Sequence, residues 1–159
     1  MTIVFTDDRS DPSLSDPVDI ARLVELATAT LAAEGFPDGT EVTLALVDES
    51  AMAGLNESHM GKAGPTDVLS FPLESLTPGS VPDAVPNGPP LLLGDVFICP
   101  AVVANNAQLA QVRFADEMAL MVVHGLLHLL GYDHVVDSEA EQMEQRERDL
   151  LAVVGLVRP

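Results

Sequence analysis

The segment Met121–His134, which reads M-V-V-H-G-L-L-H-L-L-G-Y-D-H, holds three of the four histidines in the chain. His124 and His128 stand four residues apart in an apolar run, so on a helix they lie on one face, about 40° apart and one turn from each other. Gly131 predicts the end of that helix, because glycine adopts a left-handed backbone at low cost. The chain can then turn back and bring His134 to the same point.

Three imidazoles at this spacing predict a site for one metal ion. A single histidine on an apolar helix is usually a core residue with a hydrogen-bond partner, but several polar rings in one hydrophobic run cost free energy unless each is satisfied. The motif offers three nitrogen ligands, and the lone Cys99 is a poor fourth. Catalytic zinc typically keeps its fourth position for water. We therefore expect His124, His128 and His134 to bind one zinc ion per chain and to act catalytically through the water that it activates.

The same spacing, H-x3-H-x2-G-x2-H, occurs in the long zinc-protease motif H-E-x-x-H-x-x-G-x-x-H. That motif needs a glutamate directly after the first histidine as its general base. Gly125 occupies this position here. A zinc hydrolase acting on peptides or small molecules therefore stays open as an alternative, but it would lack its proton acceptor.

Length and composition predict one soluble domain over residues 1–159. No stretch of about 20 apolar residues and no secretory signal is present, so no membrane partner is expected. A single cysteine suits a reducing compartment, and we expect the cytoplasm. The 7 basic and 25 acidic residues give a formal charge of −18, which argues against a broad nucleic-acid-binding surface.

The order of elements predicts an α+β fold, with a small mixed sheet of about four strands covered by about five helices. The metal site is expected on the central buried helix and on the turn after it. Strands are expected at 2–5, 41–47, 67–71 and 91–98, helices at about 17–34, 48–56, 100–111, 114–130 and 138–154, and a loop rich in proline and glycine at about 72–90.

Helix starts are predicted from capping residues. Asp16 is expected to cap the first helix, with Pro17 at its first position. Asp48 is expected to cap the second helix. Ser138 and Glu141 form a candidate capping box for the last helix.

The block H-G-L-L-H-L-L-G-Y-D-H at 124–134 resembles the signature of the YbeY family of bacterial rRNA maturation factors. The blocks P-T-D-V-L-S-F-P at 65–72 and L-G-D-V-F-I-C-P at 93–100 are similar to two further family blocks, and the resemblance extends from about Val42 to Gly155. It implies a single-strand-specific, metal-dependent endoribonuclease that matures the 3′ end of small-subunit (16S) rRNA and serves late ribosome quality control in the bacterial cytoplasm.

The resemblance also implies zinc as the metal, single-stranded RNA or rRNA as the substrate, and the ribosomal small subunit or its assembly proteins as partners. A non-catalytic ribosome-assembly factor with a structural metal is a further alternative. The open coordination of the three histidines counts against it.

Many family members carry a Tyr-Arg pair shortly after a Leu-Asn pair, and the corresponding residues here are His59 and Met60. Methionine cannot pair with a phosphate. Lys62, the only lysine of the chain, is therefore a candidate substitute, although an exposed lysine with no role in binding is about equally expected.

Other polar side chains are candidates for the substrate cleft. Thr66, Asp67 and Ser70 could line it through hydrogen bonds, or could serve only the turn that starts a strand. Asp133 could orient a ligand imidazole from behind, or could only hold the turn after Gly131.

Overall fold

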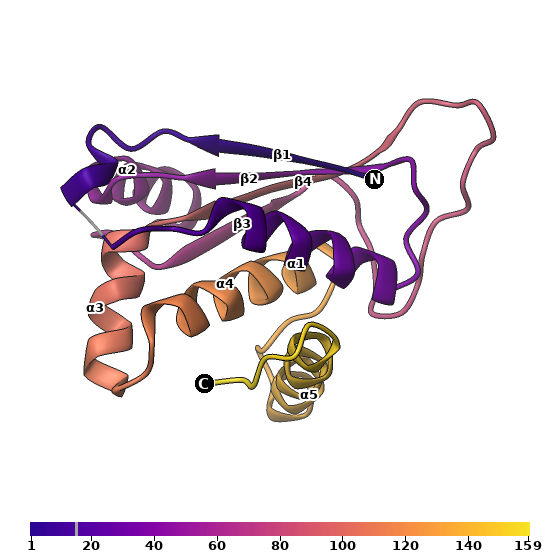
Figure 1. The fold of residues 1–159 in the computed structure, drawn as a ribbon. Coiled ribbons are helices and arrows are strands. Elements are labelled where there is room, and N and C mark those ends of the chain that lie inside the picture. The colour runs from indigo at the N-terminus through magenta and orange to yellow at the C-terminus, as the bar shows by residue number, and fades with distance from the viewer. Residues whose placement is uncertain (15) are drawn as a thin grey trace.

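The computed structural model describes residues 1–14 and 16–159 and forms one mixed sheet in the order β1-β2-β4-β3 (Figure 1). The strands are β1 (Thr2–Asp7), β2 (Thr40–Leu46), β3 (Val68–Pro72) and β4 (Leu91–Ile98). β2 pairs in parallel with β1 and with β4, whereas the edge strand β3 runs antiparallel to β4. The expected four-stranded mixed sheet is confirmed.

The five expected helices are also confirmed, and a 3-10 turn at Pro12–Leu14 precedes them. They are α1 (Ile20–Ala33), α2 (Glu49–Met60), α3 (Pro100–Ala110), α4 (Phe114–Leu129) and α5 (Asp137–Val153). In Figure 1, α1 and α4 lie along the same side of the sheet, and α5 lies beyond α4. None of the described helices is both long enough and apolar enough to span a membrane.

Helix α4 is the centre of the fold and contacts α1, α3, α5, β3 and β4. Most of its sixteen residues are buried, because the segment is apolar nearly all round. Its end has the hydrogen bonds of a Schellman motif: the Tyr132 N–H donates to the Leu127 carbonyl and the Gly131 N–H donates to the His128 carbonyl. This tight ending turns the chain back towards the face of α4 that carries the histidines.

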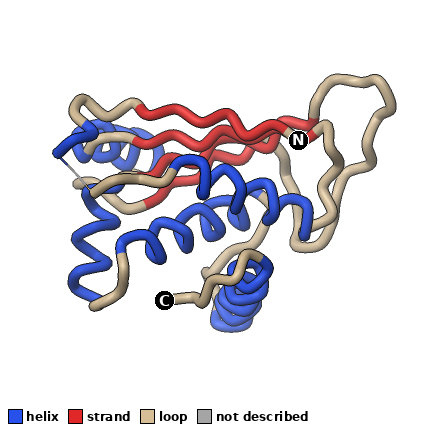
Figure 2. The backbone as a smooth tube through the Cα atoms, viewed as in Figure 1, coloured by secondary structure: helices blue, strands red, loops and turns tan. Residues whose placement is uncertain are grey.

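The loop at residues 73–90 projects beyond the end of the sheet where the chain begins (Figure 2). Leu76 and Val81 of this loop pack against the main core. A Cβ atom added at Gly131 would lie 2.2 Å from the carbonyl oxygen of Leu76, and Gly131 has a φ of +97°. Only glycine satisfies both the left-handed backbone and this close approach of the loop.

The expected start of the first helix is wrong by three residues. Helix α1 begins at Ile20, and the carboxylate of Asp19 accepts a hydrogen bond of 3.1 Å from the Arg22 N–H. Val18 packs against the core from outside the helix. Asp19, and not Asp16, is therefore the capping residue of α1.

Of the two other capping predictions, the first is confirmed in position only and the second is wrong. Asp48 stands at the N-cap position of α2, but its carboxylate accepts hydrogen bonds from the backbone and hydroxyl of Ser10 instead. Helix α5 begins at Asp137, so Ser138 lies inside the helix and cannot head a capping box with Glu141. Helix α2 also runs to Met60, beyond the expected end near Asn56, and Gly61 terminates it in a left-handed conformation.

We expect Gly131→Ala to lower the free energy of unfolding by at least about 3 kcal/mol, because backbone strain adds to the clash with Leu76. Gly61→Ala is the matched control. Its φ is also positive, at +65°, but a Cβ there meets no atom within 4 Å, so it should cost only about 1–2 kcal/mol. Urea denaturation of both variants in a chelating buffer measures the difference, and equal losses would contradict the role given to the Leu76 contact.

Candidate metal centre

Helix α4 and the turn after it bring three histidines together. His124 and His128 lie one turn apart on α4, with their Nε2 atoms 3.0 Å from each other. The ring of His134 stacks on that of His124 at a centroid distance of 5.6 Å and meets the ring of His128 edge-on at 5.0 Å. One ligand nitrogen from each of the three lies within 4.8 Å of the others. The spacing predicted this convergence.

Hydrogen bonds on the far side of two rings determine which nitrogen is free. His124 Nδ1 lies 2.9 Å from Oε1 of Glu147, and His128 Nδ1 lies 3.0 Å from the carbonyl oxygen of Tyr132. Both partners accept, so each Nδ1 carries the proton and each Nε2 presents its lone pair to the shared point. Nitrogens bound to tetrahedral zinc at about 2.0–2.1 Å stand roughly 3.3–3.4 Å apart, and the 3.0 Å between the Nε2 atoms of His124 and His128 is near that separation.

His128 is held in its neutral, ligating form. Burial lowers its pKa to about 4, and the neighbouring rings of His124 and His134 act in the same direction. Asp133 and the Tyr132 carbonyl oppose this shift without reversing it. A neutral imidazole is the form that binds a metal, so His128 remains available as a ligand well below neutral pH.

Glu147 of α5 is the functional residue that the sequence analysis missed. Its side chain is almost completely buried, with Oε1 facing His124 and Oε2 2.8 Å from Nε of Arg158. Burial alone would raise the pKa of Glu147, but the hydrogen bonds from His124 and Arg158 bring it below its usual value. Position 147 lies in the apolar stripe that Met143, Leu150 and Leu151 form on α5, so an acid on that stripe was the available signal.

A hollow of about 520 Å³ opens beside the histidines. Its lining mixes apolar and polar residues: Met60, Val68, Ser70, Pro72, His128, Gly131, Tyr132, Asp133 and His134. Two of the three histidines thus border a space that could admit water and a substrate. This arrangement is typical of a catalytic metal site and not of a closed structural one.

The structure explains why no carboxylate follows His124. A Cβ atom at Gly125 would lie 2.5 Å from Cγ1 of Val96 and 3.2 Å from Cγ2 of Val68, both on the sheet. Ser70 also donates a 2.8 Å hydrogen bond to the Gly125 carbonyl oxygen. Position 125 therefore faces the sheet at close range, and a glutamate there would have no room.

The other candidate site residues fall in different places. Ser70 borders the hollow, but its hydroxyl is engaged with α4. Asp67 accepts a hydrogen bond from the Val68 N–H, and Thr66 donates to the same carboxylate, which is the turn chemistry considered as the alternative. Lys62 is exposed, and neither it, Thr66 nor Asp67 lines the hollow. Their roles in substrate binding stay predictions.

Asp133 holds the turn that carries the third histidine. Its carboxylate accepts a 2.8 Å hydrogen bond from the backbone N–H of His134. Asp133 thus acts on His134 through the main chain. Cys99 is buried in a separate small cluster with Met52 and Leu69, where burial raises the pKa of its thiol.

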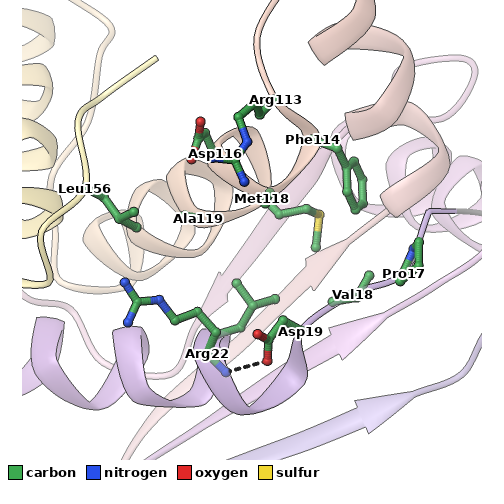
Figure 3. A pocket seen from close by; sticks show the side chains of 12 residues that line it. Pro17, Val18, Asp19, Arg22, Arg113, Phe114, Asp116, Met118, Ala119 and Leu156 are labelled. Atoms are coloured by element: carbon green, nitrogen blue, oxygen red, sulfur yellow. Dashed lines mark hydrogen bonds between the residues drawn. The ribbon is translucent and has the colours of Figure 1, made fainter.

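A second hollow, of about 220 Å³, lies at the opposite end of α4 from the histidines (Figure 3). It is largely apolar, with Val18 and Met118 among its walls and the Asp19–Arg22 cap of α1 at its rim. None of the candidate site residues lines it.

Comparison with known proteins gives one consistent result. The family model "Endoribonuclease YbeY" matches residues 6–155. Relatives of that name include one from Alteromonas mediterranea, 43% identical over 145 residues (89% of this chain and 85% of the relative), and one from Acidothermus cellulolyticus, 43% identical over 135 residues (84% and 82%). The solution structure of a Thermotoga maritima protein is similar, with a TM-score of 0.56 and 25% identity over 96% of this chain and 91% of that one.

Each of the substitutions His124→Ala, His128→Ala and His134→Ala should lower zinc affinity. The loss should exceed the roughly 10–100-fold that follows from removing an outer hydrogen-bond partner of a ligand, because a ligand itself is removed. His59→Ala is the control, because His59 packs edge-on against Phe71, outside the three-histidine cluster. Elemental analysis and chelator competition measure the effect. Full zinc content in the His128→Ala protein would show that the ligand assignment is wrong.

Proposed function

Because the chain belongs to the YbeY endoribonuclease family, we propose that it is an endoribonuclease that cleaves single-stranded RNA at the site formed by His124, His128 and His134. The observation that carries this proposal is the convergence of their ring nitrogens beside an open hollow, with two Nδ1 atoms engaged by acceptors. The group that fits this donor set best is one zinc ion per chain.

Different residues of the protein would hold the metal and admit the substrate. His124 and His128 are held with Nε2 towards the common point, and the Asp133 turn carries His134 to it. A divalent ion bound there would acidify a water molecule and stabilise negative charge developing on a phosphodiester. The hollow beside His128 and His134 gives an extended strand access to this point.

The lining of the hollow favours contact with unpaired bases over contact with the phosphate chain. Met60, Val68 and Pro72 present apolar surface there. Most basic side chains are already paired with carboxylates: Arg9, Arg22, Arg146, Arg148 and Arg158. With a formal charge of −18, the chain gains little affinity from phosphates alone.

We assign the substrate to the 3′ end of small-subunit (16S) rRNA, in maturation and late ribosome quality control in the bacterial cytoplasm. The weak phosphate attraction of this chain supports delivery of the RNA by the small subunit or an assembly protein. The peptidase alternative is not favoured, because Gly125 has no room for a general base. A purely structural metal is not favoured either, since the hollow leaves the site open.

We expect the purified protein to cut an unpaired RNA oligonucleotide and to leave the same sequence uncut in a perfect duplex. Chelator should abolish cleavage, added zinc should restore it, and His128→Ala should remain inactive under both conditions because it removes a ligand. Gel analysis of labelled RNA, with casein as a parallel substrate, provides the test. Chelator-sensitive casein hydrolysis, or RNA cleavage equal in the His128→Ala protein, would contradict the proposal.

Met60→Arg should strengthen RNA binding and steepen its dependence on salt, because Met60 lines the hollow and a guanidinium pairs with phosphate in a bidentate manner. Ser58→Arg is the matched control, since it adds the same charge to an exposed position on the same helix, outside the residues that line the hollow. Lys62→Ala should weaken binding if Lys62 reaches a phosphate. RNA-binding curves measured across a salt series test both variants against the wild type. Equal RNA affinity and equal salt dependence of Met60→Arg and Ser58→Arg would show that the end of α2 does not contact the substrate.

A further inference from the structure

Glu147 links the metal centre to the segment that follows α5. Its side chain is 2% exposed, and each carboxylate oxygen has a different partner: Oε1 faces Nδ1 of His124 at 2.9 Å, and Oε2 accepts from Nε of Arg158 at 2.8 Å. The three side chains form a continuous chain of hydrogen bonds. Arg158 thus stands one step behind the hydrogen bond that orients His124.

The segment that carries Arg158 is folded back and anchored. Gly155 has a φ of +77°, and the N–H of Leu156 donates to the Leu151 carbonyl, so the chain reverses at the end of α5. Leu156 packs against the main core, and Arg22 of α1 donates to the carbonyl oxygen of Val154. This anchoring directs Arg158 towards Glu147.

The hollow on the α5 side of the histidines, about 100 Å³, is lined by His124, His134, Ala140, Met143, Glu144, Glu147 and Arg158. Arg158 is the only lysine or arginine among the residues that line this hollow or the larger one beside His128. Its interaction with Oε2 places a cation behind a carboxylate that is otherwise surrounded by protein. Burying such a carboxylate without a cationic partner would be costly.

We propose that Arg158 is a positioning residue of the metal centre, which acts through Glu147 to fix the ring of His124. The terminal torsion of a glutamate is broad and roughly two-fold, so a carboxylate held at one oxygen alone can turn. With Arg158 on Oε2, Oε1 is directed at Nδ1 of His124. The His124 ring then keeps the orientation in which Nε2 points to Nε2 of His128, 3.0 Å away.

This inference rests on the metal site in the proposed function but not on RNA cleavage, so its test measures zinc affinity by competition with a chromophoric chelator. Arg158→Ala should weaken zinc binding about 10–100-fold, as loss of an outer partner of a metal ligand does. Arg158→Lys should restore part of the affinity. Arg148→Ala is the matched control, because Arg148 pairs at 3.5 Å with Glu144 on α5 and both side chains are about half exposed. Loss of such a solvent-exposed pair should change affinity less than about two-fold.

A double-mutant cycle that combines Arg158→Ala with Glu147→Gln tests whether Arg158 acts on zinc affinity through Glu147. Arg158 and Glu147 both act on His124 through the Glu147 carboxylate. The loss of zinc-binding free energy in the double variant should therefore be clearly smaller than the sum of the losses in the two single variants. Unfolding in chelator identifies any variant that does not fold, and Arg158→Lys then takes the place of Arg158→Ala in the cycle.

Two results would overturn the inference. One is zinc affinity in the Arg158→Ala protein equal to that of Arg148→Ala, whether or not RNA cleavage changes. The other is simple additivity in the cycle. A wild-type protein that binds no zinc would instead overturn the proposed function, so the two failures are distinguishable.

Discussion

The need to pair the Nδ1 atoms of His124 and His128 constrains the structure most strongly. Helix α4 is buried nearly all round, yet it carries His124 and His128. Each Nδ1 meets an acceptor from a different part of the chain, the Glu147 carboxylate on α5 and the Tyr132 carbonyl in the turn. Because an unpaired polar group in the core would cost about 1–3 kcal/mol, the packing of α5 and the shape of the turn are tied to these two rings.

The sequence predicted the parts of the site that depend on local spacing. The histidine repeat and the Gly131 stop act within a few residues, and the structure has both. The contact of Glu147 with His124 spans 23 residues and follows from the docking of α5, which no local pattern encodes. The helix start at Ile20 also departs from the local signal, because Asp19 caps the helix although Asp16 is the aspartate followed by proline.

Position 125 shows how the architecture restricts the chemistry. In the zinc-protease motif the residue after the first histidine is the general base, whereas here it lies against Val96 and Val68. The sheet therefore approaches α4 on the side where a protease would hold its glutamate. The space beside His128 is instead lined by apolar and polar residues, among them Met60, Ser70 and Asp133.

X-ray absorption at the zinc edge of the reconstituted protein tests the central claim most directly, because it reports the atoms bound to the metal. We predict one zinc ion per chain with three imidazole nitrogens and one oxygen at about 2.0–2.1 Å. A sulfur at about 2.3 Å, which would implicate Cys99, or a shell with fewer than three imidazoles would contradict the account.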